Sequence, residues 1–246
     1  MSDAAAAATP PAETPVISDL SRMGRVLFSP GAVFGELQHR PTIWGPWIIV
    51  SVISMIISWF QRPFQQRVGQ IISERAGRPA PPDTMVRAII GLVLTPVGVL
   101  VLVLISALIL WALASAMGGD TSFKKMMSVV FFSFPPILIQ QAITVAVLMN
   151  RGVASITGPA DMFVSLGADL ALPADAQVGY FTRFFLAGIG PLQIWALVII
   201  AVGVMVMGKT SKASAWTAAI IHFLIILCVL SGLGAFGASM MAGPSR

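Results

Sequence analysis

Five long stretches of the sequence contain no charged residue, and this segregation constrains the fold more than any other feature. None of the 15 basic and 10 acidic residues falls inside about residues 43–60, 88–117, 126–149, 184–207 and 216–241. A helix of about 20 apolar residues crosses a bilayer core of about 30 Å, and each stretch is near or above that length. The sequence therefore predicts an all-α integral membrane protein whose five transmembrane helices form one bundle.

Composition supports an integral membrane protein and limits the kinds of partner that we expect. Hydrophobic residues make up 57% of the chain and charged residues 10%, unlike a soluble globular domain. The net charge of +5 is spread over several loops without interleaved aromatic residues, so we expect contact with anionic lipid and not with nucleic acid. The one cysteine, Cys228, lies in the last stretch, which excludes an intrachain disulfide.

The third stretch is interrupted at its centre. Pro135 and Pro136 have no N–H to donate, so we expect a kink, with another helix or water satisfying the freed carbonyls of Phe131 and Phe132. Gln140 and Gln141 follow one turn later and need hydrogen-bond partners in the absence of bulk water. This span belongs inside the bundle.

The segment before the first span has a different character. Residues 1–17 are rich in Ala and Pro, which predicts a disordered tail ahead of a membrane domain over 18–246. Within 18–39, Leu20, Met23 and Leu27 form an apolar stripe, and Ser29-Pro30 favours a helix restart. We predict an amphipathic interfacial helix here; the alternative is a short helix packed on the bundle itself.

The connections and the remaining spans carry further expectations. A separate interfacial helix is predicted over Phe64–Arg75. The second span is overlong, so it tilts, bends at Pro96 or begins outside the bilayer core. The fourth span should bend at Pro191, which is followed by Gln193.

Two motifs resemble nucleotide sites but lie in the wrong context. Residues 203–210 match the phosphate-loop pattern G-x-x-x-x-G-K-T, and residues 232–237 match G-x-G-x-x-G. Both lie in or at the end of an apolar span, where backbone N–H groups are already bonded and no strand precedes the motif. We therefore expect no nucleotide partner, and we interpret Lys209 as a lysine at a helix end.

Side chains that could bind a metal or take part in catalysis are scarce within the spans. His222 stands there without an acidic residue or a second histidine, so we expect a structural hydrogen bond to another helix and no metal site. No nucleophile–base pair or carboxylate pair is visible, so we predict a protein that is not an enzyme, with no catalytic residue and no cofactor.

The loops indicate an orientation. If the N-terminus lies inside, all four lysines lie on the inner side, and the acidic 150–183 connection lies outside. This favours a multi-pass protein of a bacterial inner membrane with a cytoplasmic N-terminus. The expected lipid- or partner-facing residues are Arg22, Arg25, Lys124, Lys125, Lys209 and Lys212.

Several motifs in order resemble a known family. They are residues 28–34 (FSPGAVF) before the first span, Trp44-Gly45-Pro46 at its start, and Gly119-x-x-Ser122-Phe123-Lys124 leading to Pro135-Pro136. Together they resemble the bacterial branch of the Yip domain family over about residues 20–240. The resemblance implies a five-span helical protein with a cytoplasmic N-terminus. Eukaryotic relatives bind Rab-type GTPases, but Ile43 stands where an acidic residue usually opens the second motif, so that role is not carried over.

The function that we predict is a non-enzymatic membrane scaffold or membrane-organising adaptor. Its expected partners are membrane lipids, other membrane proteins or a second copy of the chain. The alternative is a conduit for a small solute or lipid, with a path lined by Gln140, Gln141, Gln193 and serines.

Overall fold

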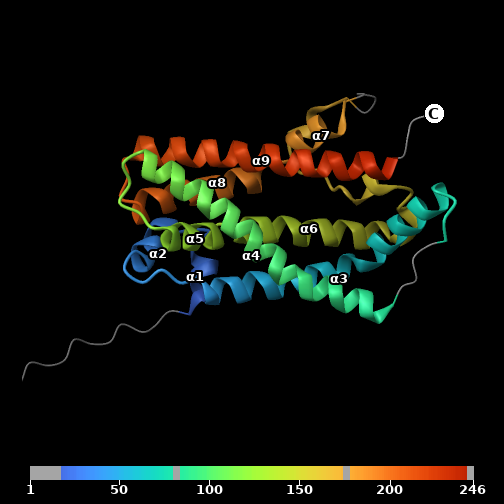
Figure 1. The fold of residues 1–246 in the computed structure, drawn as a ribbon, viewed down its shortest axis with the longest axis horizontal. Coiled ribbons are helices and arrows are strands. Elements are labelled where there is room, and N and C mark those ends of the chain that lie inside the picture. The colour runs from blue at the N-terminus through green and yellow to red at the C-terminus, as the bar shows by residue number, and fades with distance from the viewer. Residues whose placement is uncertain (1–17, 80–83, 174–177, 243–246) are drawn as a thin grey trace, which may run out of the picture.

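The computed structural model describes residues 18–79, 84–173 and 178–242, which form an elongated bundle of helices (Figure 1). The α-helices are α1 (Asp19–Arg25), α2 (Pro30–Leu37), α3 (Trp44–Arg75), α4 (Met85–Ala116), α5 (Phe123–Phe132), α6 (Pro135–Arg151), α7 (Tyr180–Ala187), α8 (Pro191–Met207) and α9 (Lys212–Ala242). Three short 3-10 helices lie between α6 and α7: η1 (Val153–Ser155), η2 (Pro159–Met162) and η3 (Ala168–Ala171). Regular secondary structure within the described ranges is helical throughout, as predicted.

The long helices account for the predicted spans. In the described part of the chain, α3, α4, α5 with α6, and α9 are each long and apolar enough to cross a membrane. The pair α7 and α8 makes a fifth candidate, bent by 62°. The bend predicted at Pro191 is therefore present. Because α8 has only 17 residues and spans about 25 Å, this candidate is a bent span and not a straight rod.

Helix α3 runs further than the sequence indicates. The prediction of a span ending near residue 60 and a separate helix over Phe64–Arg75 is wrong, because one helix reaches Arg75 with Pro63 inside it. A proline in a helix interior costs about 3 kcal/mol, so packing has to offset it. The last turns of α3 supply this packing in a small apolar cluster of Phe64, Val68, Ile71, Leu148 and Ile156.

The double proline begins a new helix. Helix α5 ends at Phe132 and α6 begins at Pro135, and the two continue in one direction in Figure 1. The N–H of Phe134 donates to the Phe131 carbonyl at 3.2 Å. The expectation that another helix or water must satisfy Phe131 is therefore wrong, because a tight turn does so locally.

The N-terminal segment forms two helices that pack on the bundle. Helix α2 begins at Pro30, as predicted, and its Val33, Phe34 and Leu37 are fully buried. The rings of Phe34 and Phe132 meet edge to face with centroids 6.5 Å apart. The apolar stripe of α2 thus faces the protein itself, which was the alternative to an interfacial helix.

Helix α4 crosses its neighbours obliquely in Figure 1, so the overlong second span tilts. The indole Nε1 of Trp47 donates to the Pro96 carbonyl at 3.2 Å, which ties α3 to the centre of α4. The main core lies where α2, α4, α5, α8 and α9 meet. Its largest fully buried side chains include Phe34, Leu110, Met126, Phe131, Phe132, Ile199 and Met207.

The bundle has two distinct ends. Helices α1 and α2 and the connections 117–122 and 208–211 lie together at the left of Figure 1, while the end of α3 and the segment before α7 lie at the right. Three segments that are separate in the sequence therefore lie at one end of the bundle.

Candidate functional site: a basic end and an intramembrane cavity

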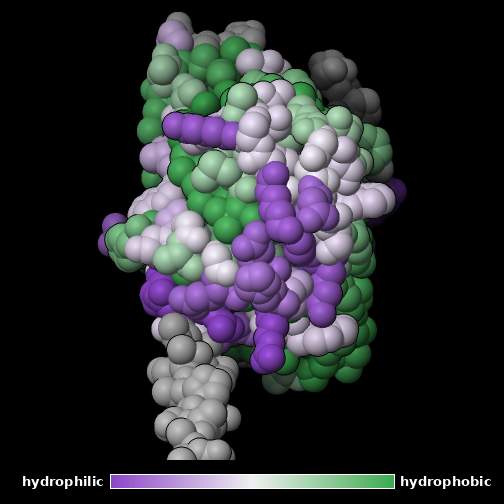
Figure 2. Space-filling model, turned by 90° about the vertical axis from the view of Figure 1, so that its left-hand side faces the viewer, coloured by the Kyte–Doolittle hydropathy of each residue, from purple (hydrophilic) through white to green (hydrophobic). Residues whose placement is uncertain are grey.

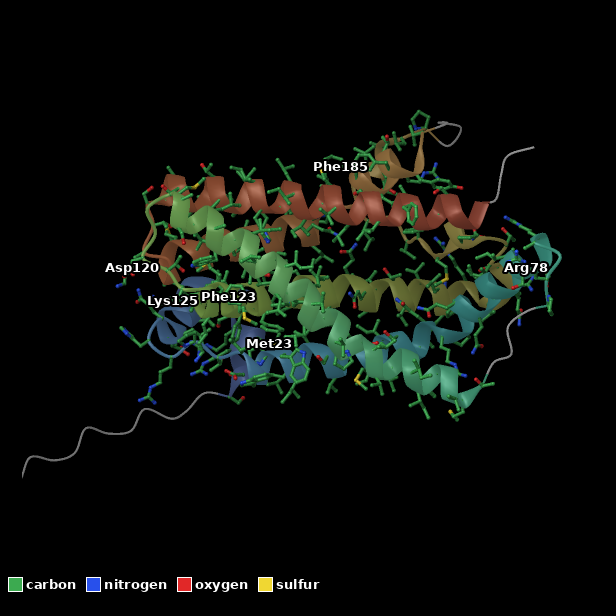
Figure 3. All side chains as sticks on the ribbon, viewed as in Figure 1. Met23, Arg78, Asp120, Phe123, Lys125 and Phe185 are labelled. Atoms are coloured by element: carbon green, nitrogen blue, oxygen red, sulfur yellow. The ribbon has the colours of Figure 1, made fainter. Side chains whose placement is uncertain are left out.

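Hydrophilic side chains gather over the end formed by α1, α2 and the connections 117–122 and 208–211 (Figure 2). Figure 3 places Lys125 and Asp120 at this end and Arg78 at the other. We call this surface the basic end; its cations are Arg22, Arg25, Arg40, Lys124, Lys125, Lys209 and Lys212.

The two N-terminal arginines are held by acidic partners. Arg22 contacts Asp19 at 2.9 Å and Glu36 at 3.4 Å, and Arg25 contacts Glu36 at 2.9 Å. Burial raises the pKa of Glu36, but hydrogen bonds and charge from Arg25 and Arg22 outweigh this and hold it below its ordinary value. These predicted partner-facing residues therefore join α1 to α2.

The lysines at the starts of α5 and α9 are placed differently. Lys124 and Lys212 are exposed and Lys125 is half-buried. Among the described residues, none of these three ammonium groups lies within ion-pair distance of a carboxylate. Together with Arg40, they are the part of the basic end whose charge no ion pair compensates within the described residues.

The loops before α5 and after α8 pack against each other. A side chain at Gly119 would meet Thr210 Cγ2 at 2.7 Å and the Gly208 carbonyl at 3.1 Å, so glycine permits the approach. Lys209 Nζ then reaches Asp120 at 3.0 Å. This hydrogen bond and the charge of Lys209 hold the pKa of Asp120 below its ordinary value.

The residues that match the phosphate-loop pattern serve in helix packing. Residues 203–207 belong to α8, and the N–H of Gly208 donates to the Val204 carbonyl at 2.9 Å. A side chain at Gly203 would meet Val129 at 2.6 Å and Phe34 at 3.0 Å. The first glycine of the motif is therefore a close-packing position between α8, α5 and α2.

A cavity of about 350 Å³ lies between α4, α5, α6, α7, α8 and α9. Its wall is mainly apolar, with Leu102, Phe223, Ile226, Leu227 and Leu230 among the lining residues. Gln140 and Gln193, from the predicted polar path, also line it, and the Gln193 side-chain amide donates to Gln140 Oε1. Gln141 is half-buried and lies outside this wall in the described structure.

The cavity also contains a serine–histidine contact. Ser106 Oγ of α4 lies 2.7 Å from His222 Nε2 of α9, which gives His222 the expected hydrogen bond between helices. The sequence showed no nucleophile–base pair, and this expectation is wrong. A serine hydroxyl and a histidine nitrogen from residues 116 positions apart lie within hydrogen-bond distance here.

This pair lacks the rest of a hydrolase site. His222 Nδ1 has no hydrogen-bond partner among the described residues, so no third group fixes its tautomer. Ser106 and His222 also lie inside helices, whose backbone N–H groups are already bonded and cannot form an oxyanion hole. Within the described ranges, no three His, Cys, Asp or Glu side chains come together as a metal site requires.

A model of the Yip1 domain matches residues 24–233, nearly the whole bundle. The chain belongs to the Yip1 domain family. A curated relative, "Membrane protein YknW" of Bacillus subtilis (strain 168), is 25% identical over 215 residues, which cover 85% of this chain and 88% of the relative. No solved structure matches.

Apart from Pro135-Pro136, which lies where α5 meets α6, the motifs that carry the family resemblance meet at the basic end of the Yip1 domain. Gly45 lies against the Asp19 carboxylate, and a side chain at this position would overlap it. Asp19 also accepts hydrogen bonds from Thr42 at 3.1 Å and Arg22 at 2.9 Å. The Gly119 motif closes against the loop after α8. These motifs therefore build the basic end rather than the cavity.

Sequence reasoning missed several residues of both sites. Glu36 and Asp120 carried a usable signal, because each is an acidic residue close to basic residues in a short connecting segment. Ser106 and Ser231 carried none, since isolated serines in apolar spans are common and their partners lie far away in the sequence.

Proposed function

We propose that this Yip1 domain protein is a non-enzymatic scaffold or adaptor of a bacterial inner membrane, and that the basic end is its working surface. The observation that carries the proposal is that Lys124, Lys125 and Lys212, at the starts of α5 and α9, lie at one end of the bundle without carboxylate partners in the described structure. Such a surface attracts anionic lipid head groups or the acidic surface of a neighbouring protein.

The arrangement also supports an inward orientation. Seven basic residues belong to the segments on this side and eight to those on the other, so the count of Lys and Arg does not decide the orientation; all four lysines, however, lie at this end, and the acidic 150–183 connection lies opposite. In this orientation the basic end faces the more negative surface of the membrane, where each cation contributes about 1 kcal/mol to attraction.

The test compares charge reversal at the two ends. We expect Lys124→Glu with Lys212→Glu to lower retention of added phosphatidylglycerol about ten-fold or more, measured by native mass spectrometry of the purified protein. The matched control is Arg78→Glu with Arg151→Glu, two exposed cations that lie outside the basic end and form no ion pair within the described residues. Equal losses in the two double variants would contradict the proposal.

A second readout addresses protein partners. Affinity purification after crosslinking in cells should lose a specific set of membrane proteins in the basic-end variant and keep that set in the control variant. Identical sets in wild type and both variants would argue against an adaptor surface at this end.

The conduit is the second candidate, because Gln140 and Gln193 do meet at a cavity. The two amides bond to each other, however, and the wall is mainly apolar, which favours a lipid over a hydrophilic solute. The double variant Gln140→Leu/Gln193→Leu separates the two functions. Flux in liposomes that is present in wild type, lost in this variant and kept in the basic-end variant would favour the conduit.

A further inference from the structure

The turn between α1 and α2 carries an exposed aromatic ring. Phe28 is 81% exposed, more than any other large apolar side chain in the described residues. The preceding Val26 is fully buried, so packing of the segment on the bundle leaves the Phe28 ring outside. A single exposed phenylalanine is ordinary on a surface in water. What matters is where this ring lies relative to the membrane.

A contact with α8 places the ring well away from the end of the bundle. The rings of Phe28 and Trp195 meet edge to face with centroids 6.3 Å apart. Trp195 is the fifth residue of α8, which ends at Met207, just before Lys209 at the basic end. The 12 residue steps from Trp195 to Met207 correspond to about 18 Å along the helix axis.

This position lies at the level of the hydrocarbon. The hydrocarbon core of a bilayer is about 30 Å thick, and head groups add about 5–7 Å on each side. Even with Met207 at the outer limit of the head groups, Trp195 lies below them. The side chain of a helical residue points toward the helix N-terminus, so the Trp195 ring does not return toward Met207. A separation of 6.3 Å between the rings leaves Phe28 below the head groups as well.

Helix α2 leads back from this level to the basic end. A side chain at Gly31 would meet Val202 at 3.9 Å, and Gln38 Nε2 donates to the Val206 carbonyl at 3.1 Å. The contacts therefore advance in the same direction along α2 and α8. Helix α1 begins on the same side, because Asp19 accepts a hydrogen bond from Thr42 just before α3. The chain thus enters and leaves at the basic end, and the turn lies deepest.

The charges of this helix pair are kept away from the turn. Residues 26–35 contain no charged side chain. Arg22 and Arg25 flank the turn on the α1 side, and both pair with Glu36, at 3.4 and 2.9 Å. A cation at membrane depth is costly unless it is paired, and these contacts supply the pairing.

The backbone of the turn is also suited to a medium without water. The N–H groups of Phe28 and Ser29 both donate to the Arg25 carbonyl, at 3.1 and 2.8 Å. The next residue, Pro30, has no N–H to satisfy. These positions therefore expose no free backbone donor, as a segment in contact with hydrocarbon requires.

We propose that α1 and α2 form a re-entrant pair whose turn enters the leaflet at the basic end and places the Phe28 ring among lipid acyl chains. The contact surface is the turn, whereas the apolar stripe of α2 faces the bundle. This interaction goes beyond the adaptor function and does not depend on the lysines of the basic end.

The test measures depth with nitroxide spin labels on single cysteines in a Cys228→Ser background. The full-length protein is reconstituted in nanodiscs of phosphatidylcholine and phosphatidylglycerol, and collisions with O₂, which is enriched in hydrocarbon, are compared with those of a water-soluble nickel chelate. Phe28→Cys should match Ile105→Cys, a 51% exposed position within α4. His39→Cys should match the exposed Lys124→Cys, and the exposed Ala32→Cys should give an intermediate value.

Two results would overturn the proposal. Frequent collisions of the label at position 28 with the nickel chelate would place the turn in water. Infrequent collisions with both reagents would mean that protein, such as a second copy of the chain, covers it. If Phe28→Cys does not accumulate, the adjacent Ser29→Cys replaces it, because Ser29 is exposed and the substitution changes one atom.

Thiol reactivity gives a second readout without a bulky label. Because the thiolate is the reactive form and is disfavoured in hydrocarbon, a charged maleimide should modify Phe28→Cys about ten-fold more slowly than His39→Cys in nanodiscs. Both cysteines should react at the same rate after denaturation in sodium dodecyl sulfate. Equal rates in nanodiscs would also overturn the proposal.

Discussion

The ammonium group of Lys209 lies 3.0 Å from the carboxylate of Asp120, 89 positions earlier in the chain. The contact bridges the loop before α5 and the loop after α8, whose glycines allow the two backbones to approach closely. Lys209 has a φ of 48°, in the left-handed region that ordinary residues avoid at a cost of about 1–2 kcal/mol. A lysine at this position therefore combines a strained backbone with a charge contact.

Replacing Lys209 separates these two effects. Lys209→Ala and Lys209→Gly both remove the ammonium group, but only glycine relieves the left-handed backbone. We expect the Gly variant to be more stable than the Ala variant by about 1 kcal/mol, measured by denaturant unfolding in detergent micelles. Equal stability of the two variants would show that the backbone at this position carries no strain.

Acid should weaken the loop contact. The Lys209 hydrogen bond lowers the pKa of Asp120 from its ordinary value of 3.8, so the contribution to stability is fully present above that value. It disappears as the pH falls through the lowered pKa of the folded protein. We expect wild type to be slightly more stable than Asp120→Asn at neutral pH, and this difference to vanish once the pH has fallen below the lowered pKa of Asp120 in the folded protein. High salt should shrink the neutral-pH difference, since the pair is exposed.

The sequence predicted the features that depend on local composition. Charge-free stretches identified the spans, Ser29-Pro30 identified the start of α2, and Pro191 identified the bend before α8. These signals work because a bilayer imposes length and polarity limits on each segment separately.

Features that depend on distant partners could not be predicted in this way. The end of the charge-free stretch near residue 60 argued for a helix end there, yet burial of Phe64, Val68 and Ile71 against Leu148 and Ile156 keeps α3 continuous. Tertiary packing here overrides local preference. The same limit applies to the contacts of Ser106 with His222 and of Gln140 with Gln193, which only the bundle geometry creates.

Gly203 should tolerate no larger side chain. A Cβ at this position would lie 2.6 Å from Val129 and 3.0 Å from Phe34, both inside the core. We expect Gly203→Ala to destabilise the protein by about 1–3 kcal/mol in thermal unfolding. Gly35→Ala is the control, because nothing lies within 4 Å of its Cβ position in α2, and helix propensity should make it neutral or stabilising. A neutral Gly203→Ala would contradict close packing of α2, α5 and α8.

The orientation is testable with single cysteines at the two ends. In a Cys228→Ser background, we expect an impermeant thiol reagent to label Arg78→Cys but not Lys124→Cys in intact spheroplasts. Both positions are exposed, so both should react once the membrane is dissolved in detergent. The reverse pattern in spheroplasts would place the basic end outside and contradict a cytoplasmic N-terminus.

The hydrogen bond between Gln140 and Gln193 predicts a non-additive mutant pair. Gln140→Leu leaves the Gln193 amide without its acceptor, and Gln193→Leu leaves the Gln140 oxygen without its donor, so each should destabilise the protein. The double variant removes both groups and should be more stable than the sum of the single effects predicts, by about 1 kcal/mol. Gln140→Leu combined with Ser51→Ala should be additive, because Ser51 Oγ forms no hydrogen bond among the described residues. Additivity in the glutamine pair as well would mean that α6 and α8 are not joined at this point, and that the two amides are free to line an open polar path.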